Sequence, residues 1–493
     1  MASTYVTWGM TVRRARLGVL SLIGLVGCAA APRDDATPLR LTTCSIPQST
    51  TDARCGTYPV FEDRAARSGR VIPLRILVLP AETESPAPDP IFVLAGGPGR
   101  GAASGVTRDV VDFFRPMRAR RDVVFVDQRG TGESHRLQCR IVPEGSAAQS
   151  AFRDLLPADR IRACREALEP IAELRLYTTP IAMDDLDEVR AALGYRSINL
   201  YGTSYGSLAA LQYLRQHPAR ARSLTLAGVA TPAQKLPPHF AAGAQAALDH
   251  VIADCAADAA CHHAFPDLAK DVATVFARFD AGSVAFDLPR AAGRDAERVS
   301  MSRLVFAERL RLMLYDLRSA RRVPLVVHRA ARGDWVPFAR ATSPTLSGAG
   351  ADFAMGLYLT ITCSESVAAI SEDDIVRGSL GSFVGEDRTR VHVRACQEWP
   401  RGRVPPEYRA PVASRVPVLM LSGLLDPATP PHWGAEATRT LPNSRQILIR
   451  NAAHWYFNDC LRDLAADFVA RGSVRDLDTR CVEALRRPPF LTQ

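Results

Sequence analysis

Short runs of aliphatic and β-branched residues recur along the chain, and segments with helical spacing lie between several of them. A short, continuous apolar run is typical of a strand that is buried on both faces of a sheet. We predict such strands at Leu74–Leu79, Ile91–Leu94, Val123–Val126, Ile198–Tyr201, Leu224–Leu226, Val418–Leu421 and Ile447–Ile449. Helices are predicted at Asp184–Leu193 and Leu208–Gln216. Strands that alternate with helices indicate an α/β fold, with a mostly parallel sheet flanked by helices.

The alternation stops between residues 231 and 408, where Ala-rich and Arg-rich helical patterns dominate. Ligands of open α/β sheets bind at the carboxyl ends of the strands, so a helical insertion here is expected to fold over that edge. The predicted organisation is a first core part at 51–230, a mainly helical cap at 231–408 and a C-terminal core part at 409–493.

The N-terminus has the pattern of an export signal. Basic residues precede an apolar stretch, Leu17–Val26, that is too short to span a bilayer. The stretch ends in Leu25-Val26-Gly27-Cys28, which resembles a bacterial lipoprotein signal with Cys28 as the lipidated residue. Residues 1–27 are then the signal peptide, and residues 28–50, rich in Ala, Pro, Thr and Ser, a tether.

This interpretation predicts an exported protein of the periplasm or cell envelope, lipid-anchored to a bacterial membrane. Cleavage near Ala29–Ala31 without lipidation is the alternative, and Arg13-Arg14 leaves twin-arginine export open.

Composition excludes several classes of protein. Apolar residues make up 47% of the 493 residues, which excludes a disordered or fibrous chain. The net charge of +9 comes mostly from Arg residues scattered among acidic ones, so no nucleic-acid partner is expected.

The chain has 11 cysteines, and without Cys28 ten remain, an even number in an exported chain. Sequence leaves the connectivity open. Nearest-neighbour pairing would join Cys44 with Cys55, Cys139 with Cys164, Cys255 with Cys261, Cys363 with Cys396, and Cys460 with Cys481. The histidines after Cys261 also permit a metal site, but export favours a disulfide there, and no metal is expected.

The strongest local motif is Gly202-Thr203-Ser204-Tyr205-Gly206, which follows the strand Ile198–Tyr201 and precedes a helix. A serine on a tight strand-to-helix turn is held in a strained conformation that exposes its hydroxyl above the sheet. Ser204 is therefore the predicted nucleophile.

A serine nucleophile needs a base and an acid. Asp426 follows the strand Val418–Leu421, and His454 follows Ile447–Ile449. Loops after adjacent parallel strands lie close together, and the order Ser, Asp, His is the one used by this kind of sheet enzyme. His432 competes for the role of the base, but it follows a pair of prolines at a predicted helix start.

An acyl-transfer site also needs donors for an oxyanion. The predicted donors are the backbone amides of Tyr205, which follows the nucleophile, and of Gly97, in the glycine-rich loop after Ile91–Leu94. This chemistry requires no cofactor.

Several motifs together resemble one family. They are Gly96-Gly97-Pro98-Gly99, Asp127-Gln128-Arg129-Gly130, the serine motif, Asp426-Pro427-Ala428-Thr429-Pro430 and His454. The chain is similar, from about Cys55 onward, to the proline iminopeptidase and tripeptidyl aminopeptidase group of α/β-hydrolases. The resemblance implies the α/β-hydrolase fold with a helical cap and removal of residues from free peptide N-termini. It also implies that Asp127 and Arg129 brace the site.

The resemblance further implies a substrate-binding role for Glu365, because relatives carry an acidic residue after a cysteine at this place. A carboxylate there could bind the protonated amine of a peptide. Two departures are visible: Ser366 stands where relatives often have a second acid, and Ala95 stands where proline iminopeptidases have His. Strict proline specificity is therefore not expected.

The sequence hypothesis is an exported serine aminopeptidase that acts on peptides with free N-termini through an acyl-enzyme. One alternative is a carboxylesterase of small esters with the same triad, which would not need Glu365. Another is an inactive hydrolase-fold binding protein, which would be expected to lack one of the catalytic groups.

Overall fold

The computed structural model describes residues 39–493 except 140, 142–147, 153–154, 291–294, 348–352 and 455–456. The proposed signal peptide and Cys28 lie outside the described residues. No helix among the residues that the structure does describe is long and apolar enough to cross a membrane.

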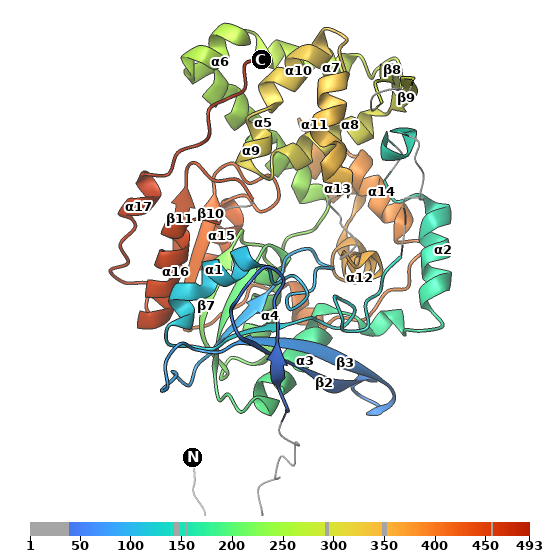
Figure 1. The fold of residues 1–493 in the computed structure, drawn as a ribbon. Coiled ribbons are helices and arrows are strands. Elements are labelled where there is room, and N and C mark those ends of the chain that lie inside the picture. Colours follow the sequence, from blue (N-terminus) through green and yellow to red (C-terminus); the bar gives the residue numbers. More distant parts are fainter. Residues whose placement is uncertain are drawn as a thin grey trace, which may run out of the picture. The chain divides into compact units, whose positions relative to one another are not determined.

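A nine-stranded sheet in the order β1-β2-β3-β5-β4-β6-β7-β10-β11 forms the centre of the fold (Figure 1). The six strands β5, β4, β6, β7, β10 and β11 pair with one another in parallel, in this order, as the sequence predicted. Their bounds are Val123–Val126 (β5), Ile91–Leu94 (β4), Ile198–Thr203 (β6), Ala221–Ala227 (β7), Val418–Gly423 (β10) and Ser444–Ile449 (β11).

Both faces of this sheet are covered, which explains why the strands are continuously apolar. On β5, Val124 and Val126 belong to one buried cluster, whereas Val123 and Phe125 belong to another. The helices flanking the sheet include α1 (Arg108–Arg118), α3 (Thr179–Ala192), α4 (Tyr205–Gln216), α15 (His432–Thr438) and α16 (Asp459–Arg471). Helix α2 (Ala158–Leu168) packs against the helical segment between β7 and β10, and α17 (Arg480–Glu483) packs against α16. The predicted α/β fold class is confirmed.

One side of the sheet is antiparallel and differs from the sequence interpretation. Strands β1 (Thr42–Cys44), β2 (Ala53–Asp63) and β3 (Ser68–Leu79) pair antiparallel in order, and β3 pairs antiparallel with β5. Residues 42–44 therefore belong to the sheet, a correction to the tether assigned to 28–50. The apolar pattern missed β1 and β2 because β1 is mostly exposed and β2 alternates between buried and exposed residues.

The segment between β7 and β10 is mainly helical, and most of its helices gather at the top of the view in Figure 1. They are α5 (Pro238–Ala257), α6 (Ala259–Ala264), α7 (Leu268–Ala277), α8 (Arg303–Met313), α9 (Leu317–Ala320), α10 (Val323–Ala331), α11 (Val336–Ser347), α12 (Met355–Ile361), α13 (Glu372–Ser379) and α14 (Asp387–Ala395). The sequence did not predict the hairpin of β8 (Val284–Leu288) and β9 (Glu297–Met301). Many of these helices share an apolar core of their own, which includes Phe306 and Phe338.

Five disulfides join the ten cysteines in the nearest-neighbour pairs expected from the sequence. Cys255 and Cys261 are bonded to each other, so neither thiol is available to a metal. Cys44–Cys55 holds β1 on β2, and Cys460–Cys481 joins α16 to α17.

Candidate active site

The turn between β6 and α4 presents Ser204 at the carboxyl end of the sheet. Ser204 has φ 57° and ψ −122°, a backbone conformation that residues other than glycine rarely adopt. The turn is tight because two glycines leave room for backbone: a Cβ on Gly202 would overlap the carbonyl of Gly206, and one on Gly206 would overlap that of Leu94. The strained serine turn that the motif predicted is therefore present.

Three side chains from three loops form a continuous hydrogen-bonded chain. Ser204 Oγ lies 3.0 Å from His454 Nε2, and His454 Nδ1 lies 2.9 Å from both carboxylate oxygens of Asp426. Because an ionised carboxylate only accepts hydrogen bonds, Nδ1 carries the proton and Nε2 is left to accept the proton of the serine hydroxyl. This is the arrangement that a serine nucleophile and its general base require.

Sheet topology explains how the three residues meet. The strand β6 ends directly before Ser204, β10 ends shortly before Asp426, and β11 ends shortly before His454. β7 separates β6 from β10, while β10 and β11 are direct parallel neighbours, as the sequence predicted. The competing candidate His432 begins α15 and stacks against Trp433.

Asp426 is 1% exposed, and its carboxylate is fully hydrogen-bonded. The amides of Ala428 and Thr429 each donate to Oδ1 at 2.8 Å, and the Thr429 hydroxyl donates to Oδ2 at 2.6 Å. Burial alone would raise the pKa of Asp426, but the charge of His454 and the donated hydrogen bonds outweigh it, and the pKa lies below its ordinary value. Asp426 is therefore ionised at neutral pH.

The glycine-rich loop after β4 lies directly beside the nucleophile. A Cβ added to Gly96 would lie 3.3 Å from Ser204 Cβ and 3.9 Å from Ser204 Oγ. Gly97 has φ 127°, which a side chain would strain. Tyr205 is the first residue of α4, so its amide has no partner from a preceding helical turn.

The Asp127–Gly130 turn holds the segment that follows the glycine-rich loop through Asp127, and it is joined to α3 through Arg129. Asp127 accepts hydrogen bonds from the amide and hydroxyl of Ser104 and from the amide of Glu133 at 3.0 Å. Arg129 is buried and binds both carboxylate oxygens of Asp185, at 2.6 and 2.9 Å.

Glu365 lies in a single helical turn, Thr362–Ser366, directly after α12, and it is 3% exposed. Thr179 donates its amide to Oε1 at 2.5 Å and its hydroxyl to Oε2 at 2.8 Å, and Tyr408 also donates to Oε2. The Thr179 hydroxyl is also 2.8 Å from the hydroxyl of Tyr205. Glu365 thus connects to the residue after the nucleophile through Thr179, and not by a direct contact with Ser204.

The helical segment touches the site at two points that the sequence did not indicate. The amide of His454 donates to the carbonyl of Tyr315 at 3.1 Å, and the two rings pack edge to face at 4.8 Å. The amide of Ala354 donates to the carbonyl of Gly99 at 2.8 Å. No local motif marks Tyr315, whereas Thr429 lay within the quoted Asp-Pro-Ala-Thr-Pro motif.

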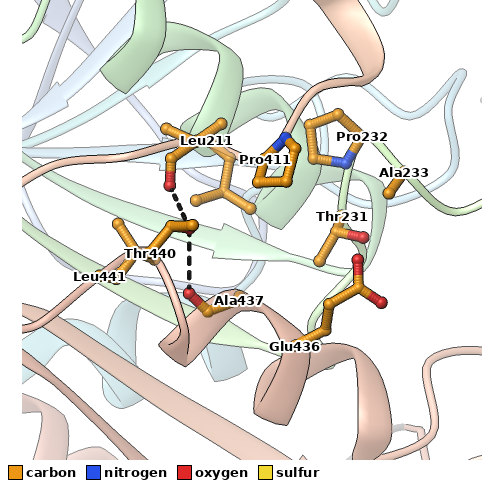
Figure 2. A pocket seen from close by; sticks show the side chains of 10 residues that line it. Leu211, Thr231, Pro232, Ala233, Pro411, Glu436, Ala437, Thr440 and Leu441 are labelled. Atoms are coloured by element: carbon orange, nitrogen blue, oxygen red, sulfur yellow. Dashed lines mark hydrogen bonds between the residues drawn. The ribbon is translucent and has the colours of Figure 1, made fainter.

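A separate apolar crevice lies between α4, α15 and the loops after β7 and before β10 (Figure 2). Pro232, Pro411 and Leu211 line it, and Thr440 donates to the carbonyls of Val412 and Ala437 at its floor, at 2.7 and 3.5 Å. Ser204, Asp426 and His454 are not among its lining residues, so this crevice is distinct from the triad.

Residues 89–459 match the model of the alpha/beta hydrolase fold family. This match spans well over half of the chain, and it includes all three triad positions. The protein belongs to the α/β-hydrolase fold family.

Individual relatives match over part of the chain. A probable proline iminopeptidase of Streptomyces coelicolor is 32% identical over 147 residues, which are 30% of this chain and 35% of the relative. Serine protease Hip1 of Mycobacterium tuberculosis is 26% identical over 224 residues, 42% of each chain. The matched regions thus span between about a third and two fifths of these relatives' length.

Among solved structures, a proline iminopeptidase of Mycobacterium smegmatis aligns with 85% of this chain and 98% of its own, at 18% identity and a TM-score of 0.38. At that score the likeness adds nothing to the family assignment.

Proposed function

We propose that the protein is a serine aminopeptidase that releases residues or short peptides from free peptide N-termini. The observation that carries this proposal is the geometry of Ser204, His454 and Asp426, with a 3.0 Å contact between nucleophile and base. Relatives named as proline iminopeptidases and as a serine protease support a peptidase over other serine hydrolases.

In the proposed mechanism, His454 Nε2 takes the proton of Ser204 Oγ as the oxygen attacks the substrate carbonyl. The amides of Gly97 and Tyr205 hold the negative oxygen of the tetrahedral intermediate, and His454 then gives its proton to the leaving amine. Asp426, ionised and buried, stabilises the imidazolium ion. Water attacks the acyl-enzyme by the same route, with His454 again as the base.

The residues 231–408 act as a cap in this proposal. Tyr315 packs on the base, and Ala354 is hydrogen-bonded to the oxyanion loop, so the segment borders the catalytic centre on two sides. Peptide substrates would reach Ser204 between the cap and the sheet.

Recognition of the substrate amine by Glu365 remains part of the proposal. Both of its carboxylate oxygens accept hydrogen bonds from Thr179 or Tyr408, so an amine would have to replace one of these donors. An ammonium group is a stronger donor than a hydroxyl, which permits such an exchange.

We also propose that the protein is exported and anchored through a lipid on Cys28. Five disulfides support export, because such bonds persist in oxidising compartments. After cell fractionation, the intact protein should be found with membranes and its Cys28→Ser form with soluble proteins. Equal membrane association of both forms would rule out the anchor.

Hydrolysis of a matched panel of substrates tests the activity. The panel contains free-amine aminoacyl and tripeptidyl amides, their N-blocked counterparts and short-chain esters, and the enzymes are the soluble portion, Ser204→Ala and Asp426→Asn. We expect cleavage of free-amine amides, with kcat/KM lowered by on the order of 10⁴ or more in both variants.

The panel also separates the alternatives. Turnover confined to esters would replace the aminopeptidase by a carboxylesterase with the same triad. If the wild type and Ser204→Ala were equally inert on all substrates, the protein would be a binding module instead.

A further inference from the structure

A buried cluster of charged side chains lies in the helical segment. A single side chain, that of Tyr315, lies between this cluster and the proposed catalytic base His454. We define the arginine cluster as Glu308 and Arg311 of α8 together with Arg388 of α14. Arg311 Nη2 lies 3.1 Å from Glu308, and Arg388 Nη1 forms a second ion pair with the same carboxylate. The three side chains are between 4% and 9% exposed.

The arginine cluster borders the catalytic centre from both sides. Arg311 Nη1 donates to the hydroxyl of Tyr315 at 2.6 Å, and the ring of Tyr315 packs on His454. On the other side, His392 Nδ1 lies 2.8 Å from the backbone carbonyl of Arg388 and its Nε2 lies 2.7 Å from the hydroxyl of Tyr358, whose ring is 5.7 Å from that of Phe353. The ring of Phe353 lies beside Gly99 of the glycine-rich loop.

Charge is not balanced within the arginine cluster, which holds two guanidinium groups and one carboxylate. Neighbouring His392 does not change this sum, because burial and the charge of Arg388 lower its pKa to about 3 and leave the ring neutral. The remaining contacts are with aromatic rings: Phe240 lies 5.2 Å from Arg311 and 5.0 Å from Arg388.

An unbalanced buried charge is unfavourable unless a counter-ion pairs with it. Arg388 has a donor for such a partner: its Nε is buried and has no hydrogen-bond partner among the described residues. Guanidinium groups bind carboxylates through two parallel hydrogen bonds, and the binding is strong where water is excluded.

We propose that the arginine cluster is a carboxylate-binding subsite, so that the enzyme prefers peptides whose scissile bond lies near a carboxylate. This proposal rests on the proposed aminopeptidase function. The carboxylate is the C-terminus of a short peptide or an acidic side chain, and both present the same chemistry to Arg388. A bound carboxylate would balance the charge of the cluster.

Matched peptides test the proposal and separate the two sources. The first pair is a free-amine tetra-alanine with a C-terminal carboxylate and the same peptide with a C-terminal amide. The second pair is amidated and differs only by Glu or Gln at the residue after the scissile bond. For wild-type protein we expect kcat/KM at least tenfold higher for the charged member of one pair.

Variants show whether Arg388 causes the preference. Arg388→Met should reduce the charged-to-neutral ratio of kcat/KM about tenfold, to near one, and Arg388→Lys should retain part of it. Glu308→Gln removes the carboxylate that competes with the substrate for Arg388, so this variant should raise the ratio. It provides a second test if Arg388→Met does not fold. Arg394→Met, an exposed position on the same helix, is the matched control and should keep the wild-type ratio.

Two outcomes would overturn the subsite. One is a wild-type ratio near one in both pairs, and the other is an Arg388→Met variant that loses activity equally on charged and neutral peptides, as a purely structural ion pair would. If no peptide is cleaved, the aminopeptidase proposal fails, and monomethyl adipate against methyl hexanoate then tests the same preference on esters.

Discussion

Two buried carboxylates, Asp426 and Glu365, have pKa values that are shifted in opposite directions. Asp426 is paired with His454, and its pKa lies below the ordinary value despite burial. Burial raises the pKa of Glu365 to about 7, against the lowering effects of the hydrogen bonds from Thr179 and Tyr408 and of the charge of Arg409. The difference follows from the partner of each carboxylate, because the electrostatic interaction with His454 lowers the pKa of Asp426, whereas the groups that donate hydrogen bonds to Glu365 are neutral.

Glu365 is predicted to make stability depend on pH. Its ordinary pKa is 4.5, and its pKa in the folded chain is about 7, so between these values the folded chain binds more protons than the unfolded one. The free energy of unfolding therefore falls as pH rises through this window, by about 3 kcal/mol, and stays constant above it. Glu365→Gln should remove this component when thermal unfolding is followed from pH 4 to 8.

The exposed Glu407→Gln is the matched control, and its profile should run parallel to that of the wild type. Parallel profiles for Glu365→Gln would contradict the expectation. The same variant also tests the proposed amine site, since its loss of kcat/KM should be larger on free-amine than on N-blocked amides.

At the scale of elements, the β6–α4 turn depends on backbone packed against backbone. Gly206 lies at the point where α4 approaches the end of β4, next to the carbonyls of Leu94 and Ala95. A helix that begins this close to a strand leaves no space for a side chain, and the overlap with backbone cannot be relieved by a rotamer change.

Gly206→Ala is predicted to lower the free energy of unfolding by about 3 kcal/mol, as overpacking does, and to remove activity because Ser204 moves with the turn. Chemical denaturation and the substrate panel measure the two effects. Gly194→Ala is the comparison: Gly194 has a φ of 81° but open space around it, so only backbone strain of about 1 kcal/mol is expected. Equal stability of Gly206→Ala and wild type would show that the turn can relax.

For the whole molecule, four of the five disulfides join segments that are not paired in the sheet; the exception, Cys44–Cys55, joins β1 to β2. Cys363–Cys396 connects the turn that carries Glu365 with the end of α14, which carries Arg388, across 33 residues. This bond thus ties two sides of the helical segment that border the proposed substrate path.

Replacing Cys363 and Cys396 together by Ala is predicted to lower the free energy of unfolding by about 4 kcal/mol, because a long loop is released in the unfolded chain. The matched control is the double replacement at Cys255 and Cys261, which are only 6 residues apart, with an expected loss of about 2 kcal/mol. Denaturant unfolding of both variants checks the order, and a larger loss at the short loop would contradict it.

Local signals in the sequence were sufficient for the parallel part of the sheet and for the chain of Ser204, His454 and Asp426. Each of these strands is an apolar run, and each of the three residues lies in a turn that follows such a run. The pattern therefore predicts both the strand and the position where the strand ends. The disulfides match the nearest-neighbour pairing, although the sequence left their connectivity open.

Only the tertiary structure decided how the helical segment meets the site. The packing of Tyr315 on His454, the ion pairs of Arg311 and Arg388 with Glu308, and the burial of Glu365 against Thr179 join residues that are far apart in sequence. Such contacts depend on the angles and offsets at which helices pack, and no short pattern encodes these. The antiparallel strands β1 and β2 were missed for a related reason. Their residues are exposed or alternate between buried and exposed, and they form strands because they pair with neighbouring strands of the sheet.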